Sequence, residues 1–154
     1  MDIKINWVQS MELLDGTSND MVYVLPEKFK IPTEAGIYIF ARKYGETISA
    51  VYIGKADNLR QRLEQQFDKV QLMMALRNSG KGKKVLLWGR IKTKGKKKLS
   101  KIFKIIEPHF IEYATINGHE LVNIKGTKSA THKITNVGNL DIRKILKNKM
   151  NLKK

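Results

Sequence analysis

The chain of 154 residues is 42% hydrophobic and carries 30 Lys and Arg against 14 Asp and Glu, a formal net charge of +16. This size and composition predict one folded domain over residues 1–154, and the lack of cysteine excludes disulfides, thiolate metal sites and cysteine nucleophiles. No apolar run is long enough to cross a membrane, so we expect no membrane partner, and the lack of cysteine fits a cytoplasmic protein. The net charge should attract a polyanion such as nucleic acid.

The first 34 residues have a mixed pattern. The segment NWVQSMELLDG favours a short helix or strand that ends at Asp15-Gly16, and MVYVLP favours a short strand closed by Pro26. We therefore expect an N-terminal extension over residues 1–31, ahead of a core over residues 32–139.

A β-hairpin and two helices are predicted next. TEAGIYIFAR and ISAVYIG are rich in strand-forming residues and are separated by a turn signal at Lys43–Glu46. Asp57 is the expected N-cap of a helix from Asn58 to about Phe67. The segment KVQLMMALRN predicts a second helix that ends near Ser79-Gly80.

The second half of the chain contains a third predicted strand and a long helix. KKVLLWGRI favours a strand, and a lysine-rich link leads into an apolar-periodic helix that opens shortly before Ser100. Residues 140–154 predict a basic C-terminal helix or tail. Together these elements predict an α+β fold with a small central antiparallel β-sheet, about three main strands, flanked by helices.

Two tyrosines are expected to share one face of the hairpin. Alternation along the second strand puts Val51 and Ile53 on one face and Tyr52 on the other. Placing the aliphatic residues of both strands against one core therefore leaves Tyr38 and Tyr52 together on the opposite face. Taken singly, each tyrosine is better explained as a half-buried strand aromatic, and only the combination with the residues below favours a site.

The following turn and helix bring cations toward this face. Leu59, Leu63 and Phe67 mark the buried stripe of the helix. Arg62 lies at the edge of that stripe and is expected to lean over the sheet, although its stem could simply shield the sheet. In the turn, Lys55 follows Gly54, a glycine that would leave room for a phosphate to approach the backbone.

Glu107 is the third expected part of the site. Its neighbours on the helix are apolar, so its carboxylate should lie on the inward side, where it needs a metal, a protein donor or a cation such as a nearby lysine. Pro108 should kink or restart the helix. Asn123 follows after a loop and could supply an oriented amide.

These residues resemble a known family. The GIY tripeptide at 36–38, the YIG tripeptide at 52–54 and KADNLRQRL are similar to the motifs of the GIY-YIG endonuclease superfamily, and most similar to the N-terminal nuclease domain of the bacterial excision-repair endonuclease. IIEPHFIEYATINGHELVN resembles the family's glutamate helix and following asparagine. HELVNIKGTK and THKITNVGN resemble the tail of small stand-alone bacterial members, and the resemblance runs from about Pro32 to Asn139.

The resemblance implies a metal-dependent endonuclease that hydrolyses nucleic-acid phosphodiester bonds, DNA more than RNA, with one Mg²⁺ or Mn²⁺. The catalytic residues it implies are Tyr38, Tyr52, Lys55, Arg62, Glu107 and Asn123, with Glu107 as the metal ligand. In this mechanism Tyr38 takes a proton from the attacking water and Tyr52 orients the water or the phosphate. The residues expected to bind nucleic acid are Gly54, Lys55, Arg60, Lys94, Lys96, Lys97, Lys98 and Lys101.

The sequence departs from the family pattern at two places. Gln66 stands where the family usually has histidine or tyrosine and cannot act as a base, and the loop before Asn123 is longer than in the repair enzyme. Two alternatives therefore stay open: a nucleic-acid-binding module derived from a nuclease, without turnover, and a basic RNA-binding or assembly protein.

Overall fold

The computed structural model describes residues 2–8, 10–16, 21–93, 95–122, 132–138 and 141–152. The strands are β1 (Asp2–Trp7), β2 (Met11–Glu12), β3 (Leu14–Asp15), β4 (Tyr23–Val24), β5 (Gly36–Tyr44), β6 (Thr47–Ala56), β7 (Lys83–Arg90), β8 (His132–Val137) and β9 (Lys149–Leu152). The helices are α1 (Leu59–Phe67), α2 (Val70–Arg77) and α3 (Lys96–Ile116), with short 3-10 turns η2 (Lys28–Lys30) and η3 (Ile142–Lys144).

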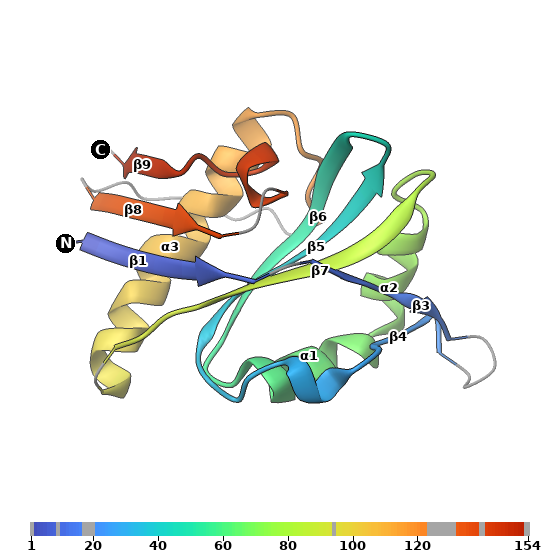
Figure 1. Ribbon diagram of the computed structural model, residues 1–154, viewed down its shortest axis with the longest axis horizontal. Coiled ribbons are helices and arrows are strands. Elements are labelled where there is room, and N and C mark those ends of the chain that lie inside the picture. The colour runs from blue at the N-terminus through green and yellow to red at the C-terminus, as the bar shows by residue number, and fades with distance from the viewer. Residues whose placement is uncertain are drawn as a thin grey trace.

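The predicted sheet of about three strands is wrong. The main sheet has seven strands in the order β6-β5-β7-β1-β8-β9, with β2 also paired to β7, and it curls strongly across the molecule (Figure 1). The sheet is mixed, because β1 runs parallel to β8 whereas the other pairs are antiparallel. The three predicted strands are neighbours at one end of this sheet, and β3 and β4 form a separate two-stranded sheet.

Strand β1 accounts for most of the error at the N-terminus. Ile3, Ile5 and Trp7 alternate with more exposed residues and are all buried, the pattern of a strand with one face on a core. Strand β1 lies between β7 and β8. The first residues are therefore an internal part of the sheet and not an extension outside residues 32–139.

The C-terminal segment also differs from its predicted helix. Ile142, Ile145, Leu146 and Met150 are buried at helix-like spacing, which explains the prediction. The first three belong to η3 and the turn after it, whereas Met150 lies in β9, where it pairs with Ile134 of β8. Because β8 supplies backbone partners, the last described residues form a strand.

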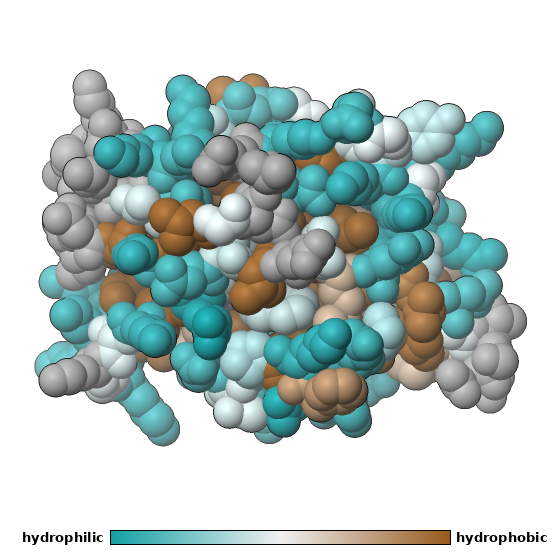
Figure 2. Space-filling view, in the orientation of Figure 1, coloured by the Kyte–Doolittle hydropathy of each residue, from teal (hydrophilic) through white to brown (hydrophobic). Residues whose placement is uncertain are grey.

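Helices cover the two faces of the sheet separately (Figure 1). One apolar cluster joins Ile37, Ile39 and Ile53 to the buried side of α3. A second cluster, on the opposite face, joins Tyr38 and Phe40 to α1 and α2. The surface in Figure 2 is mainly hydrophilic, with apolar residues in separate small groups.

The helices agree with their predicted positions except at details of their ends. Asn58, not Asp57, is the N-cap of α1, since its side chain accepts a hydrogen bond from the Gln61 backbone N–H at 3.1 Å. Helix α3 continues through Pro108, where we expected a kink or a restart. In the part of the chain that the structure describes, no helix combines the length and the apolar character needed to cross a bilayer.

Candidate active site

The structure brings the two motif tyrosines together on one face of the sheet. The rings of Tyr38 and Tyr52 are stacked, with their centroids 6.0 Å apart and an interplanar angle of 19°. The register explains this contact, because Tyr52 pairs with Phe40 and is therefore the diagonal neighbour of Tyr38. A register shift between Phe40 and Ala41 makes Tyr52, and not Val51, the partner of Phe40. Val51 therefore packs in the same apolar cluster as Tyr38 and not, as expected, with Ile53.

Gly54 makes room for the phenol of Tyr38. It is the direct cross-strand partner of Tyr38. A Cβ atom added at Gly54 would lie 2.4 Å from both Cζ and the hydroxyl oxygen of Tyr38, far inside any allowed contact. The glycine of the YIG tripeptide is thus required by the tyrosine of the GIY tripeptide, and the approach of a phosphate at Gly54 stays a prediction.

Helix α1 completes this side of the site. Gln66 is 1% exposed, and its amide nitrogen donates to the Tyr38 hydroxyl oxygen at 2.5 Å. Arg62 lies one helical turn before Gln66, is exposed, and is close enough for its charge to act on Tyr38. Arg62 therefore belongs to the helix that covers the tyrosines, near enough for its charge to lower the pKa of Tyr38, and Gln66 makes a contact that the sequence did not predict.

The environment of Tyr38 opposes its expected role as a base. Tyr38 is 1% exposed, and this burial, followed by the neighbouring Tyr52, raises the pKa of Tyr38 well above its ordinary value. The hydrogen bond from Gln66 and the charge of Arg62 lower the pKa but do not reverse the shift. Tyr38 consequently keeps its proton near neutral pH, whereas Tyr52 is the more exposed phenol of the pair.

Lys55 and Glu107 lie on the opposite face of the sheet. Lys55 pairs with Ile37, and its ammonium lies over the ring of Phe103 on α3, 5.8 Å from the centroid. Glu107 is one helical turn beyond Phe103 and is only 7% exposed. The sheet thus separates Lys55 and Glu107 from the two tyrosines. A ligand could reach both pairs around β6, because β6 is the edge strand.

The segment after α3 runs along the same edge strand. The backbone N–H of Ala50 donates to His119 Nδ1 at 2.9 Å, and the backbone N–H of Val122 donates to the Val51 carbonyl at 2.8 Å. Burial of His119 lowers its pKa, while a hydrogen bond to the Lys144 backbone opposes this shift. Asn123, which follows Val122 in the sequence, lies outside the described residues.

Arg60 has a structural contact instead of a free guanidinium. Its Nε donates to the Ile31 carbonyl at 2.8 Å and its Nη2 donates to the Phe29 carbonyl at 2.9 Å. These bonds fasten the turn η2 to α1. Arg60 therefore stabilises the turn, and its expected contact with nucleic acid stays a prediction.

The expected lysines of α3 remain available to a polyanion. Lys96, Lys97, Lys98 and Lys101 are exposed on the first turns of the helix, and Lys94 lies outside the described residues. The first turn of α3 contains no acidic residue. The N-terminus of a helix carries partial positive charge, so lysines there are repelled by the helix dipole. An anion bound nearby would reduce this repulsion.

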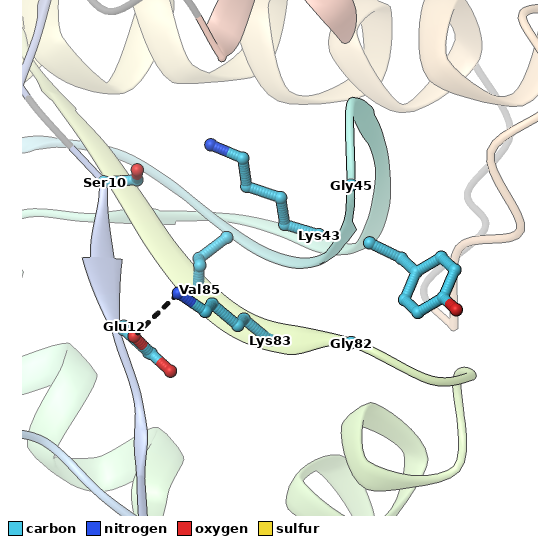
Figure 3. A pocket seen from close by; sticks show the side chains of 8 residues that line it. Ser10, Glu12, Lys43, Gly45, Gly82, Lys83 and Val85 are labelled. Carbon is cyan, nitrogen blue, oxygen red and sulfur yellow. Dashed lines mark ion pairs between the residues drawn. The ribbon is translucent and has the colours of Figure 1, made fainter.

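No compact metal cage is present in the described residues, because no group of three His, Cys, Asp or Glu side chains converges there. A pocket of about 550 Å³ lies instead at the far end of the hairpin, between β2, the β5–β6 turn and β7 (Figure 3). Its cations are already neutralised, since Lys83 pairs with Glu12 at 3.8 Å and Lys43 pairs with Asp141 at 3.0 Å. This pocket is therefore a poor candidate for an anion site.

Comparisons with protein-family models, with curated proteins and with solved structures find no match for this chain. The resemblance to the GIY-YIG nucleases therefore rests on the motif residues alone.

Proposed function

We propose that the protein is a divalent-metal-dependent endonuclease acting on nucleic acid, DNA in preference to RNA, and that the scissile strand crosses the edge of β6. The observation that carries the proposal is the stacked Tyr38–Tyr52 pair with Arg62 beside it. The half-buried phenol of Tyr52, next to the exposed guanidinium of Arg62, offers a donor and positive charge to a phosphate. Both residues, and the buried Tyr38 behind them, stand at the motif positions.

An edge strand allows groups from both faces to reach one ligand. Tyr52 and Lys55 are three residues apart on β6, a span of roughly 10 Å along the strand. Their side chains project to opposite faces, toward α1 and α3 respectively. A strand of nucleic acid lying across this edge would contact Arg62 and Tyr52 on one side and Lys55 on the other.

Arg62 has the chemistry needed for charge stabilisation. Its planar guanidinium matches phosphate oxygens in a bidentate manner and stays protonated at every relevant pH. Such an electrostatic contact in a transition state is commonly worth about 3 kcal/mol of barrier. The exposure of Arg62 leaves it accessible to substrate.

The donor set near Glu107 fits a metal shared with substrate. Mg²⁺ usually keeps several waters and is held by one or two carboxylates together with substrate phosphates, so the single carboxylate of Glu107 is sufficient as the protein ligand. A bound divalent cation would polarise the phosphate and stabilise the leaving oxygen. Glu107, on the inward side of α3, is the residue that would hold it.

The buried phenol takes a positioning role in this proposal. Tyr38 keeps its proton because its pKa is raised, and its contact with Gln66 holds the ring against Tyr52. Tyr52 then orients the attacking water or a phosphate oxygen, and the proton of that water passes to solvent. This replaces the expected transfer to Tyr38.

The test is cleavage of a panel of labelled single-stranded, double-stranded and branched DNA and RNA, with Mg²⁺ or Mn²⁺ and with EDTA. Glu107→Gln and Arg62→Ala should lose cleavage by a hundredfold or more while retaining binding. The control Glu112→Gln removes a carboxylate five residues along the same helix and should cleave normally. Full activity in either site variant refutes the assignment.

A second candidate is a nucleic-acid-binding module without turnover. The raised pKa of Tyr38 favours it, because it removes the expected base from the site, and Gln66 stands where the family usually has a residue that can titrate. This candidate predicts binding by the wild type without metal-dependent cleavage on any substrate of the panel.

A further inference from the structure

Arg42 and Lys84 form a pair of cations on the same face of the sheet as the tyrosines. The two residues are direct partners in the register of β5 and β7. Like charges placed opposite each other destabilise a sheet unless something compensates. Lys84 is only 6% exposed, and burial, followed by the charge of Arg42, lowers its pKa.

Neither cation forms an ion pair within the described part of the chain. Lys84 Nζ donates to the Gly80 carbonyl at 2.5 Å, just after α2, so the position of Lys84 is explained by the end of that helix. Arg42 Nη1 donates to the Lys81 carbonyl at 2.9 Å. Its Nη2 has only a long contact, 3.5 Å from Ser49 Oγ.

Arg42 is one of the residues that line a pocket of about 420 Å³, together with Ser49, Ser79 and Glu120 from the segment after α3. The Ser79 hydroxyl is used, since it donates to the Leu76 carbonyl at 2.6 Å. The Ser49 hydroxyl has no acceptor among the described residues. The pocket therefore contains a guanidinium nitrogen and a hydroxyl that are both available to donate.

We propose that this pocket binds a phosphate group, through Arg42 Nη2 and the Ser49 hydroxyl. A tetrahedral oxyanion would compensate the opposed charges of Arg42 and Lys84, and it matches the hydrogen-bond donors that the pocket offers. The Glu120 carboxylate on the exposed side of the pocket opposes anion binding and is the natural point at which to test the charge dependence.

The position of the pocket connects it to the proposed nuclease site. Ser49 pairs with Arg42, and Tyr52 pairs with Phe40, so the pocket lies two residues of β5, about 7 Å, along the strand from the level of Tyr52. This identification rests on the proposed function: the phosphate belongs to a neighbouring nucleotide of the strand held at Tyr52. A free phosphate ion offers the same chemistry.

The test measures binding to the full chain in the Glu107→Gln background, so that cleavage plays no part. Inorganic phosphate is titrated while the backbone amides of Ser49 and Ser79–Lys81 are followed by NMR, and a short oligonucleotide is titrated separately. Arg42→Gln should weaken the affinity for whichever ligand binds by about tenfold. For the oligonucleotide, it should also reduce the slope of log affinity against log salt concentration by about one. The control Arg77→Gln removes an exposed arginine of α2 and should change neither.

Two outcomes separate the sources. Saturable shifts with inorganic phosphate identify an independent anion site, whereas shifts with the oligonucleotide alone identify a phosphate of the bound strand. Glu120→Gln, an exposed change that should not affect folding, should tighten binding about two- to fivefold. The proposal is overturned if neither ligand shifts these amides, or if Arg42→Gln and Glu120→Gln bind like the Glu107→Gln parent, even when the wild type cleaves nucleic acid.

Discussion

At the scale of single residues, the closest fit in the site is between Gly54 and Tyr38. Any side chain at Gly54 would overlap the end of the phenol ring, 2.4 Å away from the position of a Cβ. The stacking of Tyr38 on Tyr52 depends on the same space. The two tripeptides of the motif are therefore coupled by packing, independently of any chemistry they carry out.

Gly54→Ala should lower the free energy of unfolding by about 1 to 3 kcal/mol, the usual cost of overpacking a core. The same change in a Tyr38→Leu background should cost much less, because leucine lacks the atoms that the new methyl group meets. Urea unfolding of the four proteins in a double-mutant cycle measures the difference. Equal costs in the two backgrounds would show that the overlap is not the cause.

Residue patterns predict only part of this packing. Alternation along the strands places Tyr38 and Tyr52 on one face, as the structure has them. The role of Gly54 depends on which residue stands opposite it, and that pairing is set by the hairpin register. The contact of Gln66 with Tyr38 depends on the position of α1 over the sheet, which the sequence alone does not specify.

At the scale of elements, Arg60 and Arg62 belong to one helix and have separate tasks. Arg60 bonds two carbonyls at the turn η2, whereas Arg62 is exposed beside the tyrosines. Arg60→Ala should cost about 1 to 3 kcal/mol of stability through the lost charged hydrogen bonds, with cleavage per folded molecule nearly unchanged.

Arg62→Ala should do the reverse, with a change in stability within about 0.5 kcal/mol and a large loss of cleavage. Thermal unfolding and cleavage, measured on both variants, provide the comparison. If Arg60→Ala lost cleavage while remaining as stable as the wild type, the assignment of the two arginines would be reversed.

His119 links the segment after α3 to β6 only in its neutral form. The neutral ring accepts the Ala50 N–H at Nδ1, and burial lowers the pKa of His119 below its unfolded value of about 6.5. Folding thus favours the neutral form. Its contribution to stability is fully present above about pH 6.5 and is lost as the pH falls through the folded pKa.

The wild type should therefore lose stability between pH 7 and pH 5, and His119→Gln, which cannot titrate, should lose less over the same range. Urea unfolding at a series of pH values measures both slopes, and the other histidines, His109 and His132, are common to the two proteins. Identical slopes would mean that His119 is not buried in its neutral form.

Local signals predicted the elements whose partners are close in sequence. The hairpin β5–β6, the helices α1 and α2, and β7 carry their own turn signals and periodicity. Strand β1 is not predicted because its partners, β7 and β8, lie far away in the chain. Strand β9 pairs with the nearby β8, which the sequence analysis does not predict as a strand either. The apolar residues near the C-terminus have helix-like spacing, but they are buried by a turn followed by a strand and not by a helix.

At the scale of the whole molecule, β1 connects the two halves of the sheet. It lies between β7, next to the motif hairpin, and β8, which carries β9 (Figure 1). Removing it would expose the buried face formed by Ile3, Ile5 and Trp7 and their neighbours.

A shortened protein of residues 32–139 should therefore lack a cooperative unfolding transition. Near-UV circular dichroism during urea unfolding, compared with the full chain, tests this expectation. A transition with the midpoint of the full chain would restore the view that the first 31 residues are a separable extension.

The central claim is that groups from both faces of the sheet act on one phosphate at the edge of β6. Paramagnetic broadening by Mn²⁺ tests it most directly, with a phosphorothioate oligonucleotide bound so that the strand is not cleaved. The claim predicts that amide signals of Tyr52 to Lys55 on β6 and of Phe103 to Glu107 on α3 broaden together, and that Glu107→Gln abolishes both effects. Broadening confined to one of these faces, or unchanged in Glu107→Gln, would contradict it.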